Sequence, residues 1–200
     1  MKSSGAKSRL SPILSRGERQ ELTSLLLVGV LGALREAGLL ASTHLVSSDP
    51  EMLQLATRLG ASTVREARDE GVNAAVEAGV RALESPSRVL VLPSDLPILR
   101  PSNLRHIMAL SELLQVVIAP SASFNGTNAL VFLPRVGPPL SYDNDSFWNH
   151  VRGSGRKGLS VGVVSSPGLT FDLDSPDDLR KLARARTNNP AVAFARRATG

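Results

Sequence analysis

Two short acidic stretches follow apolar segments, and their carboxylates are candidate ligands for a metal ion. In "RVLVLPSDLP", Asp95 follows a continuous apolar run, typical of a strand buried on both faces, so its carboxylate is expected at the carboxyl edge of a sheet. In "LTFDLDSPDDL", Asp172 and Asp174 alternate with Phe171 and Leu173, so both project from one face. If Asp174 lies near Asp95, the pair could hold Mg²⁺, whose remaining coordination positions would be taken by water and substrate phosphates. A turn-capping Asp95 and a solvated Asp172 are the alternatives.

A basic stretch at the start of the sequence is the candidate phosphate-binding loop. "MKSSGAKSRLSPILS" contains Lys2, Lys7 and Arg9 among a glycine and several serines, before the chain becomes apolar. Cationic side chains concentrated in one loop attract anions. A small phosphorylated substrate is therefore the expected ligand.

Two further stretches carry hydroxyl and amide groups suited to an anion. In "SFNGTNALVFL", Gly126 permits positive φ or close backbone approach, and Thr127 and Asn128 could cradle a carboxylate or phosphate. An ordinary polar turn is the alternative. In "DSFWNH", Ser146 stands at an expected helix start as a candidate N-cap, where free N–H groups bind anions. No cysteine is present, and no histidine stands near a serine and an acid in a pattern that indicates a catalytic triad, so nothing supports a protein nucleophile.

An alternation of helices and strands must position these residues. Helical periodicity bounded by glycine and proline predicts helices, and β-branched runs predict strands. We expect helices over 15–38, 49–60, 69–84, 100–114 and 175–186, and strands over 42–48, 62–67, 88–93, 115–121, 128–134 and 159–165. Asp49, Ser102 and Ser175 are the expected N-caps of three helices. This order predicts a single-domain α/β fold with a mostly parallel, doubly wound sheet, whose ligands lie beyond the carboxyl ends of the strands.

Composition narrows the class of partner. The 200 residues suit one domain, and the longest apolar stretch, "LTSLLLVGVLGAL", has 13 residues, fewer than the ~18 of a membrane span. The absence of an apolar leader and of cysteine suits the cytoplasm. The net charge of +5 is concentrated at the two ends, and aromatic residues are only 4%, too few for base stacking. We therefore expect no membrane partner and no nucleic acid.

Six stretches together resemble the 2-phospho-L-lactate guanylyltransferase family. They are "GAKSRLSPILS", "EGVNAAVEAG", "PSDLPIL", "GTNALVF", "DSFWNH" and "FDLDSPDDL", in this order along almost the whole chain. The resemblance implies a GT-A-type nucleotidyltransferase that moves GMP from GTP to the phosphate of 2-phospho-L-lactate, phosphoenolpyruvate or 3-phosphoglycerate, releasing pyrophosphate. It further implies a role in biosynthesis of the deazaflavin coenzyme F-420, Mg²⁺ as cofactor, and small-molecule partners. A homodimer is left open.

The resemblance assigns nucleotide-binding roles to the basic loop. Lys2, Gly5, Lys7 and Arg9 match the loop that holds the triphosphate of GTP. Lys7 and Arg9 are expected to be catalytic, because they would stabilise the leaving pyrophosphate. Asn73 matches a position near the nucleoside.

It also assigns the metal and the acceptor. Asp95 and Asp174 match two metal-binding aspartates, so Asp95 is expected to be catalytic and to contact the nucleotide. Thr127 and Ser146 match contacts to the carboxylate of the acceptor. Asp143 stands where the family tends to have glycine, and its carboxylate could narrow the acceptor pocket or repel the acceptor.

One expected element has no counterpart in the sequence. The family places a β-strand ahead of the basic loop, so we expect this sheet to lack its first strand, which would expose two neighbouring edges. We place the nucleotidyltransferase domain at 1–187 and a basic C-terminal tail at 188–200. The alternatives are another GT-A nucleotidyltransferase, acting on a sugar phosphate or on molybdopterin, and a catalytically silent nucleotide-binding protein. The absent L-x-A-G-G loop counts against the first, and the retained Asp95 and Asp174 against the second.

Overall fold

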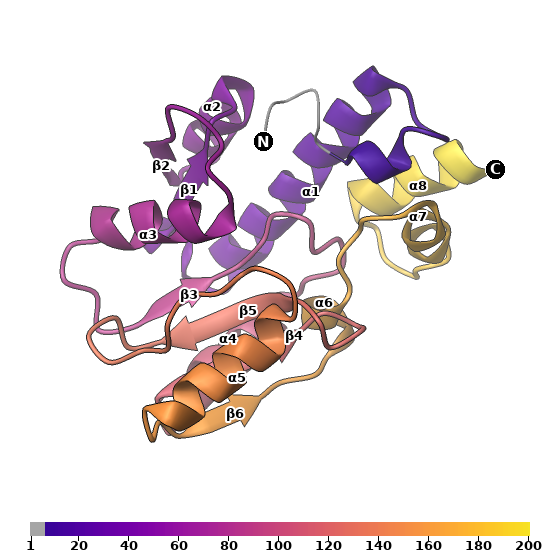
Figure 1. The fold of residues 1–200 in the computed structure, drawn as a ribbon. Helices are drawn as coiled ribbons and strands as arrows, with labels where there is room; N and C mark the ends of the chain where they lie inside the picture. The colour runs from indigo at the N-terminus through magenta and orange to yellow at the C-terminus, as the bar shows by residue number, and fades with distance from the viewer. Residues whose placement is uncertain (1–6) are drawn as a thin grey trace.

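The computed structural model describes residues 7–200 and contains two β-sheets with helices around them (Figure 1). β1 (His44–Ser47) and β2 (Ser62–Arg65) pair in parallel as a small sheet. The larger sheet has the order β3-β5-β4-β6 and consists of β3 (Val89–Val91), β4 (Val116–Pro120), β5 (Thr127–Phe132) and β6 (Val161–Val163). β5 is antiparallel to β3 and β4, and β6 is parallel to β4. The predicted α/β class is confirmed, and among the described strands of the larger sheet β5 alone reverses direction.

Most helices begin and end where the local signals predicted. Asp49 caps α2, and Ser175 caps α7 by accepting a hydrogen bond from the Asp178 backbone N–H. Within residues 7–200, no helix is long and apolar enough to span a bilayer. The helices are α1 (Arg16–Glu36), α2 (Pro50–Arg58), α3 (Val72–Ala82), α4 (Pro101–Ser111), α5 (Ser146–Arg156), α6 (Pro167–Thr170), α7 (Pro176–Ala183) and α8 (Pro190–Thr199), with short 3₁₀ turns η1 (Ser8–Leu10) and η2 (Leu40–Ser42).

Two predicted N-caps are wrong by one or two residues. Ser102 does not cap α4, because Arg100 is the N-cap and its backbone N–H donates to Asn103 Oδ1. A proline takes the first helical position, where its missing N–H is not needed, so the helix starts ahead of Ser102. Ser146 is likewise the first residue of α5 itself, and its N-cap is Asp145, in the left-handed region at φ 59°.

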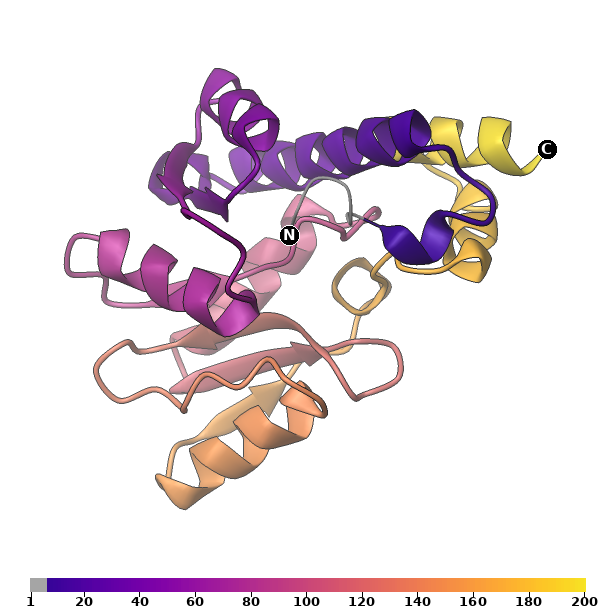
Figure 2. The same cartoon turned by 45° about the horizontal axis from the view of Figure 1, so that its top comes forward.

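Residues 188–200, which we expected to form a basic tail, contain helix α8 for most of their length. α8 packs against α1 and α7, and Figure 2 shows it beside the N-terminal part of α1. Its apolar residues belong to the same core cluster as apolar residues of those two helices. On the outer side, Arg197 lies 3.1 Å from Glu21. The basic composition of this segment therefore belongs to the exposed face of a packed helix.

A cavity of about 1290 Å³ has walls from both sheets. β1 and β3 belong to different sheets, and within residues 7–200 no strand precedes α1. Leu90 and Val91 of β3, expected to be buried, are only half-buried and line this cavity. The expected lack of a first strand concerns the chain ahead of the basic loop, outside the described residues, and stays a prediction. The apolar part of the wall also includes Leu27, Val30, Leu31, Leu45, Val46 and Val76.

Candidate active site

The basic loop meets both predicted metal ligands just beyond the end of β3. Lys7 Nζ lies 2.7 Å from Asp95 Oδ2 and 3.0 Å from Asp174 Oδ1, and it also donates to the carbonyl oxygen of Leu173. The Lys7 side chain is 9% exposed, and those of Asp95 and Asp174 are 25% and 46% exposed. Burial by itself lowers the pKa of Lys7, but the two carboxylates outweigh burial and raise the pKa above its usual value. The Lys7 ammonium is therefore charged at neutral pH.

The local backbone explains how these three side chains meet. Lys7 adopts the left-handed conformation, with φ 54°, which is uncommon outside glycine. The Leu173 backbone N–H donates to the Asp95 carbonyl oxygen at 3.1 Å, which fixes the segment before α7 beside the end of β3. Because Leu173 is fully buried, Asp172 and Asp174 on either side of it face the opposite way and line the cavity.

Asp172 is a third carboxylate in this cluster, although the sequence left a solvated side chain as its alternative. It is half-buried, and its Oδ1 accepts a hydrogen bond from Asn128 Nδ2 at 3.1 Å. Burial raises the pKa of Asp172; the Asn128 hydrogen bond lowers it, and the negative charges of Asp95 and Asp174 add to the rise. The alternation of polar and apolar residues in "FDLD" was the sequence signal that placed both aspartates on one face.

The cluster suits a cation that arrives with phosphates. Within residues 7–200, no three His, Cys, Asp or Glu side chains gather closely enough to hold a metal by themselves. Mg²⁺ in proteins often takes only one or two carboxylates, because water and phosphate oxygens complete its octahedron. One carboxylate oxygen of Asp95 and one of Asp174 face the same point, and the Lys7 ammonium lies at that point.

The other basic residues predicted to bind nucleotide have different positions. Arg9 is 78% exposed, and its Nη1 lies 3.9 Å from Asp174 Oδ2, so the guanidinium stands at the cavity wall with most of its surface open to solvent. Lys2 and Gly5 lie outside the residues that the structure describes.

The two predicted acceptor-binding hydroxyls are in contact with each other in another part of the cavity wall. Ser146 Oγ donates to Thr127 Oγ1 at 3.2 Å, and Thr127 Oγ1 lies 3.0 Å from His150 Nδ1. All three side chains are buried. Gly126 precedes Thr127, and a Cβ at Gly126 would lie 3.1 Å from Ser121 Oγ, so close backbone approach, and not positive φ, explains this glycine.

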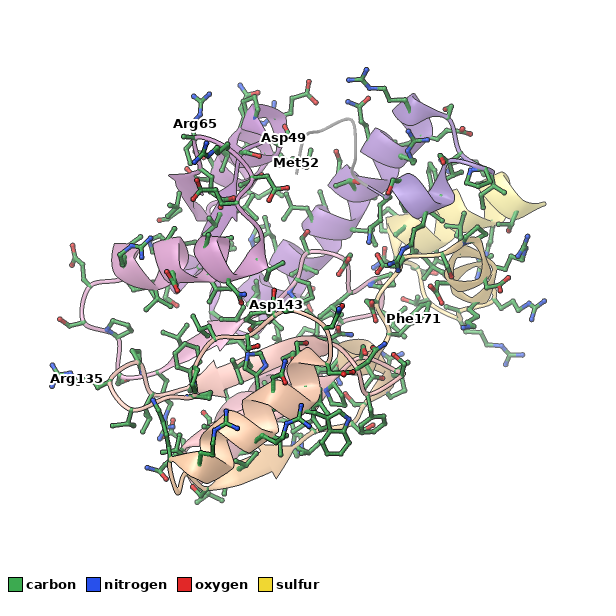
Figure 3. The ribbon with its side chains drawn as sticks, viewed as in Figure 1. Asp49, Met52, Arg65, Arg135, Asp143 and Phe171 are labelled. Atoms are coloured by element: carbon green, nitrogen blue, oxygen red, sulfur yellow. The ribbon has the colours of Figure 1, made fainter. Side chains whose placement is uncertain are left out.

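Asn73 anchors the loop that precedes α5. Its Oδ1 accepts a hydrogen bond from the Tyr142 backbone N–H at 2.8 Å, and its Nδ2 donates to Asp143 Oδ2 at 3.2 Å. Asp143 and Phe171, both labelled in Figure 3, line the cavity from this loop and from the segment before α7. Sequence reasoning did not find this link, because it joins positions 70 residues apart.

The chain matches the family described as "Guanylyl transferase CofC like" over residues 1–197. It is similar to the phosphoenolpyruvate guanylyltransferase of Rubrobacter xylanophilus, at 40% identity over 89% of this chain and 87% of that protein. The 2-phospho-L-lactate guanylyltransferase of Methanothermobacter thermautotrophicus is 33% identical over 88% and 78% of the two chains. The 3-phospho-D-glycerate guanylyltransferase of Phenylobacterium zucineum is 34% identical over 90% and 85%.

Two solved structures share the fold at low sequence identity. A protein from Desulfovibrio desulfuricans G20, named as a nucleotide-diphospho-sugar transferase, has a TM-score of 0.75 at 18% identity, over 96% of this chain and 87% of that one. A CMP:2-keto-3-deoxy-manno-octonic acid synthetase has a TM-score of 0.56 at 11% identity, over 86% and 88%. These likenesses show that the chain shares its α/β fold with both proteins. Given the match over residues 1–197 and the relatives above, the chain belongs to the guanylyl transferase CofC-like family.

Proposed function

We propose that this protein transfers GMP from GTP to the phosphate of a three-carbon phospho-acid. An oxygen of the acceptor phosphate bonds to the α-phosphorus of GTP, and the bond from that phosphorus to the bridging oxygen breaks, so pyrophosphate leaves with the electron pair. The observation that carries the proposal is a single cavity whose wall holds both the Asp95 and Asp174 carboxylates and the Thr127 and Ser146 hydroxyls. The activities named for three relatives at 33–40% identity support phosphoenolpyruvate, 2-phospho-L-lactate and 3-phosphoglycerate as candidate acceptors.

The side chains would act by position and charge, because a phosphate acceptor is already an anion at neutral pH and needs no protein base. Asp95 and Asp174 would hold Mg²⁺, which when bound offsets negative charge on the phosphates. Lys7 and Arg9 would bind oxygens of the departing pyrophosphate. Asp172 would add its carboxylate to the same part of the wall.

The acceptor would bind through its carboxylate at Thr127 and Ser146, near the start of α5. Asp143 lines the same cavity and has a negative charge where the family tends to have glycine. The Asp143 carboxylate would weaken the binding of an acceptor that has a second negatively charged group beside it. Lys2 and Gly5 remain proposed contacts to the nucleotide, and Asn73 would act through the loop that it anchors.

The resemblance of the sequence to the 2-phospho-L-lactate guanylyltransferase family supports a place in coenzyme F-420 biosynthesis in the cytoplasm, with GTP as the nucleotide. The two alternatives from the sequence lead to different outcomes in one assay. If the protein is instead another GT-A nucleotidyltransferase, it would need a sugar phosphate or molybdopterin as acceptor. A catalytically silent protein would bind GTP without turnover.

A pyrophosphate-release assay tests the proposal directly. The protein is incubated with GTP and Mg²⁺ and with each of the three phospho-acids in turn, and Asp95→Asn serves as the inactive control. We expect release with at least one acceptor, dependent on Mg²⁺ and absent from the control. If none of the three supports release while a sugar phosphate or molybdopterin does, the proposed acceptor class is wrong.

A further inference from the structure

The hydrogen bonds around His150 fix which of its ring nitrogens holds the proton. His150 is fully buried on α5, and its Nε2 lies 3.1 Å from the Ser141 backbone nitrogen. A backbone N–H can only donate, so Nε2 must accept and has no hydrogen. Burial lowers the pKa of His150 to about 4, so the ring is neutral at pH 7. The single ring hydrogen is therefore on Nδ1, which lies 3.0 Å from Thr127 Oγ1.

This tautomer determines the direction of the Thr127 hydroxyl. Thr127 Oγ1 accepts one hydrogen bond from His150 Nδ1–H and a second from Ser146 Oγ–H at 3.2 Å. A hydroxyl oxygen has two acceptor lone pairs, so both are used. No other polar atom of residues 7–200 is hydrogen-bonded to Thr127 Oγ1. The hydroxyl hydrogen remains available, and Thr127 lines the cavity.

We propose that His150 is a positioning residue that makes Thr127 a donor only, so that this part of the cavity selects a group that accepts hydrogen bonds without donating any. A carboxylate is such a group, and a protonated acid, an alcohol or an amide is not an equivalent partner. The inference rests on the proposed function, because it deepens how that site would recognise the carboxylate of the acceptor. His150 itself would not contact the substrate.

Three substitutions at His150 separate its two hydrogen bonds. His150→Asn places an amide N–H near the former Nδ1 and can still donate to Thr127. His150→Gln extends its amide toward the former Nε2, so it can accept from the Ser141 N–H but no longer donates to Thr127. His150→Phe removes both contacts. His106→Gln, at an exposed position of α4, is the matched control.

The assay measures KM for phosphoenolpyruvate at saturating GTP, KM for GTP, and the melting temperature of each variant. We expect His150→Gln and His150→Phe to raise the acceptor KM about ten- to a hundredfold, the range for a lost hydrogen bond to a charged group. The KM for GTP should stay within about twofold of the parent protein, and His150→Asn should recover most of the acceptor affinity. In a Thr127→Val background, His150→Phe should have no further effect on the acceptor KM, because the hydroxyl that it orients is gone. A further rise of about ten- to a hundredfold in the acceptor KM on adding His150→Phe to Thr127→Val would overturn the proposal. A rise in the KM for GTP as large as the rise in the acceptor KM would also overturn it.

A measurement on the unsubstituted protein does not depend on turnover or on the folding of a variant. In ¹⁵N-labelled protein near pH 7, the directly bonded hydrogen of His150 should appear on Nδ1. A hydrogen on Nε2 would refute the inference even if guanylyl transfer is confirmed. Conversely, an Nδ1–H in a protein that transfers GMP to none of the three acids would refute the proposed function and with it the carboxylate as the ligand.

Discussion

Replacement of Lys7 by methionine tests whether this ammonium and a metal ion share the same two carboxylates. Lys7 Nζ lies 2.7 Å from Asp95 and 3.0 Å from Asp174, and its side chain is almost fully buried. Methionine keeps the length of the side chain and removes the charge. The two carboxylates are then left close together without their cation.

The structure sets the size of the expected effect. Removing one partner of a fully buried ion pair costs about 3–5 kcal/mol. Asp95 and Asp174 are 25% and 46% exposed, so water screens them, and we reduce the expected loss to about 1–3 kcal/mol. For a chain of this length, each kcal/mol shifts the melting temperature by about 2–4 °C, which gives a decrease of about 2–12 °C for Lys7→Met without Mg²⁺.

The assay compares melting temperatures with and without Mg²⁺ in the absence of nucleotide. Because the ammonium competes with the ion for the same oxygens, Mg²⁺ should raise the melting temperature of Lys7→Met more than that of the parent protein. Lys181→Met is the control, since the exposed Lys181 side chain pairs with Asp178 at 3.3 Å, and this substitution should change stability by less than about 1 kcal/mol. An equal Mg²⁺ effect on the parent and on Lys7→Met would refute the shared site.

Four further outcomes are expected. Asp95→Asn and Asp174→Asn should each abolish pyrophosphate release while far-UV circular dichroism remains that of the parent; substantial residual activity would exclude the two-aspartate metal site. GTP should support faster release than ATP, CTP or UTP, and equal rates with all four would contradict guanylyl specificity. The pKa of His150 in the folded protein is about 4, below its usual 6.5, because burial disfavours the charged ring. The free energy of unfolding should therefore be highest above pH 6.5 and fall by about 3 kcal/mol as the pH decreases to 4. Urea unfolding of His150→Phe should lack that part of the pH dependence. Adding about six to eight apolar, β-branched residues ahead of Met1 should raise both the melting temperature and the affinity for GTP, and unchanged values for both would show that the sheet needs no such strand.

Local signals predicted the elements well and the contacts between distant segments poorly. α2 and α7 were predicted with their caps, because Asp49 and Ser175 form hydrogen bonds within their own first turns. Ser102 was assigned wrongly for the same local reason, since several polar residues near a proline compete to cap one helix. Helix α8 was not predicted at all, because its apolar residues became informative only once α1 and α7 gave them a surface to pack on.

The candidate site shows the same limit. Asp95 follows a strand and Ser146 begins a helix, which a single sequence reveals, but the metal and acceptor roles of Asp95, Asp174, Thr127 and Ser146 came from the resemblance to the family. The partner of Asp95, 88 residues away at Lys7, was expected to bind phosphate, and nothing in the sequence indicated an ion pair between them. An ion pair of this kind depends on the left-handed backbone at Lys7, and lysine has no local preference for that conformation.

The half-buried state of β3 connects the fold to the site. The continuous apolar run in "RVLVLP" predicts burial on both faces, yet Leu90 and Val91 line the cavity, and among residues 7–200 β3 pairs only with β5. The free edge of β3 and the apolar wall beside it are therefore suited to one more strand. The Lys7 ammonium lies beside Asp95, just beyond the end of β3, so a strand along this edge could lead directly into the basic loop. Such a strand would bury the apolar wall and fix the position of Lys7 at the same time, so the stability of the sheet and the geometry of the phosphate-binding loop should vary together.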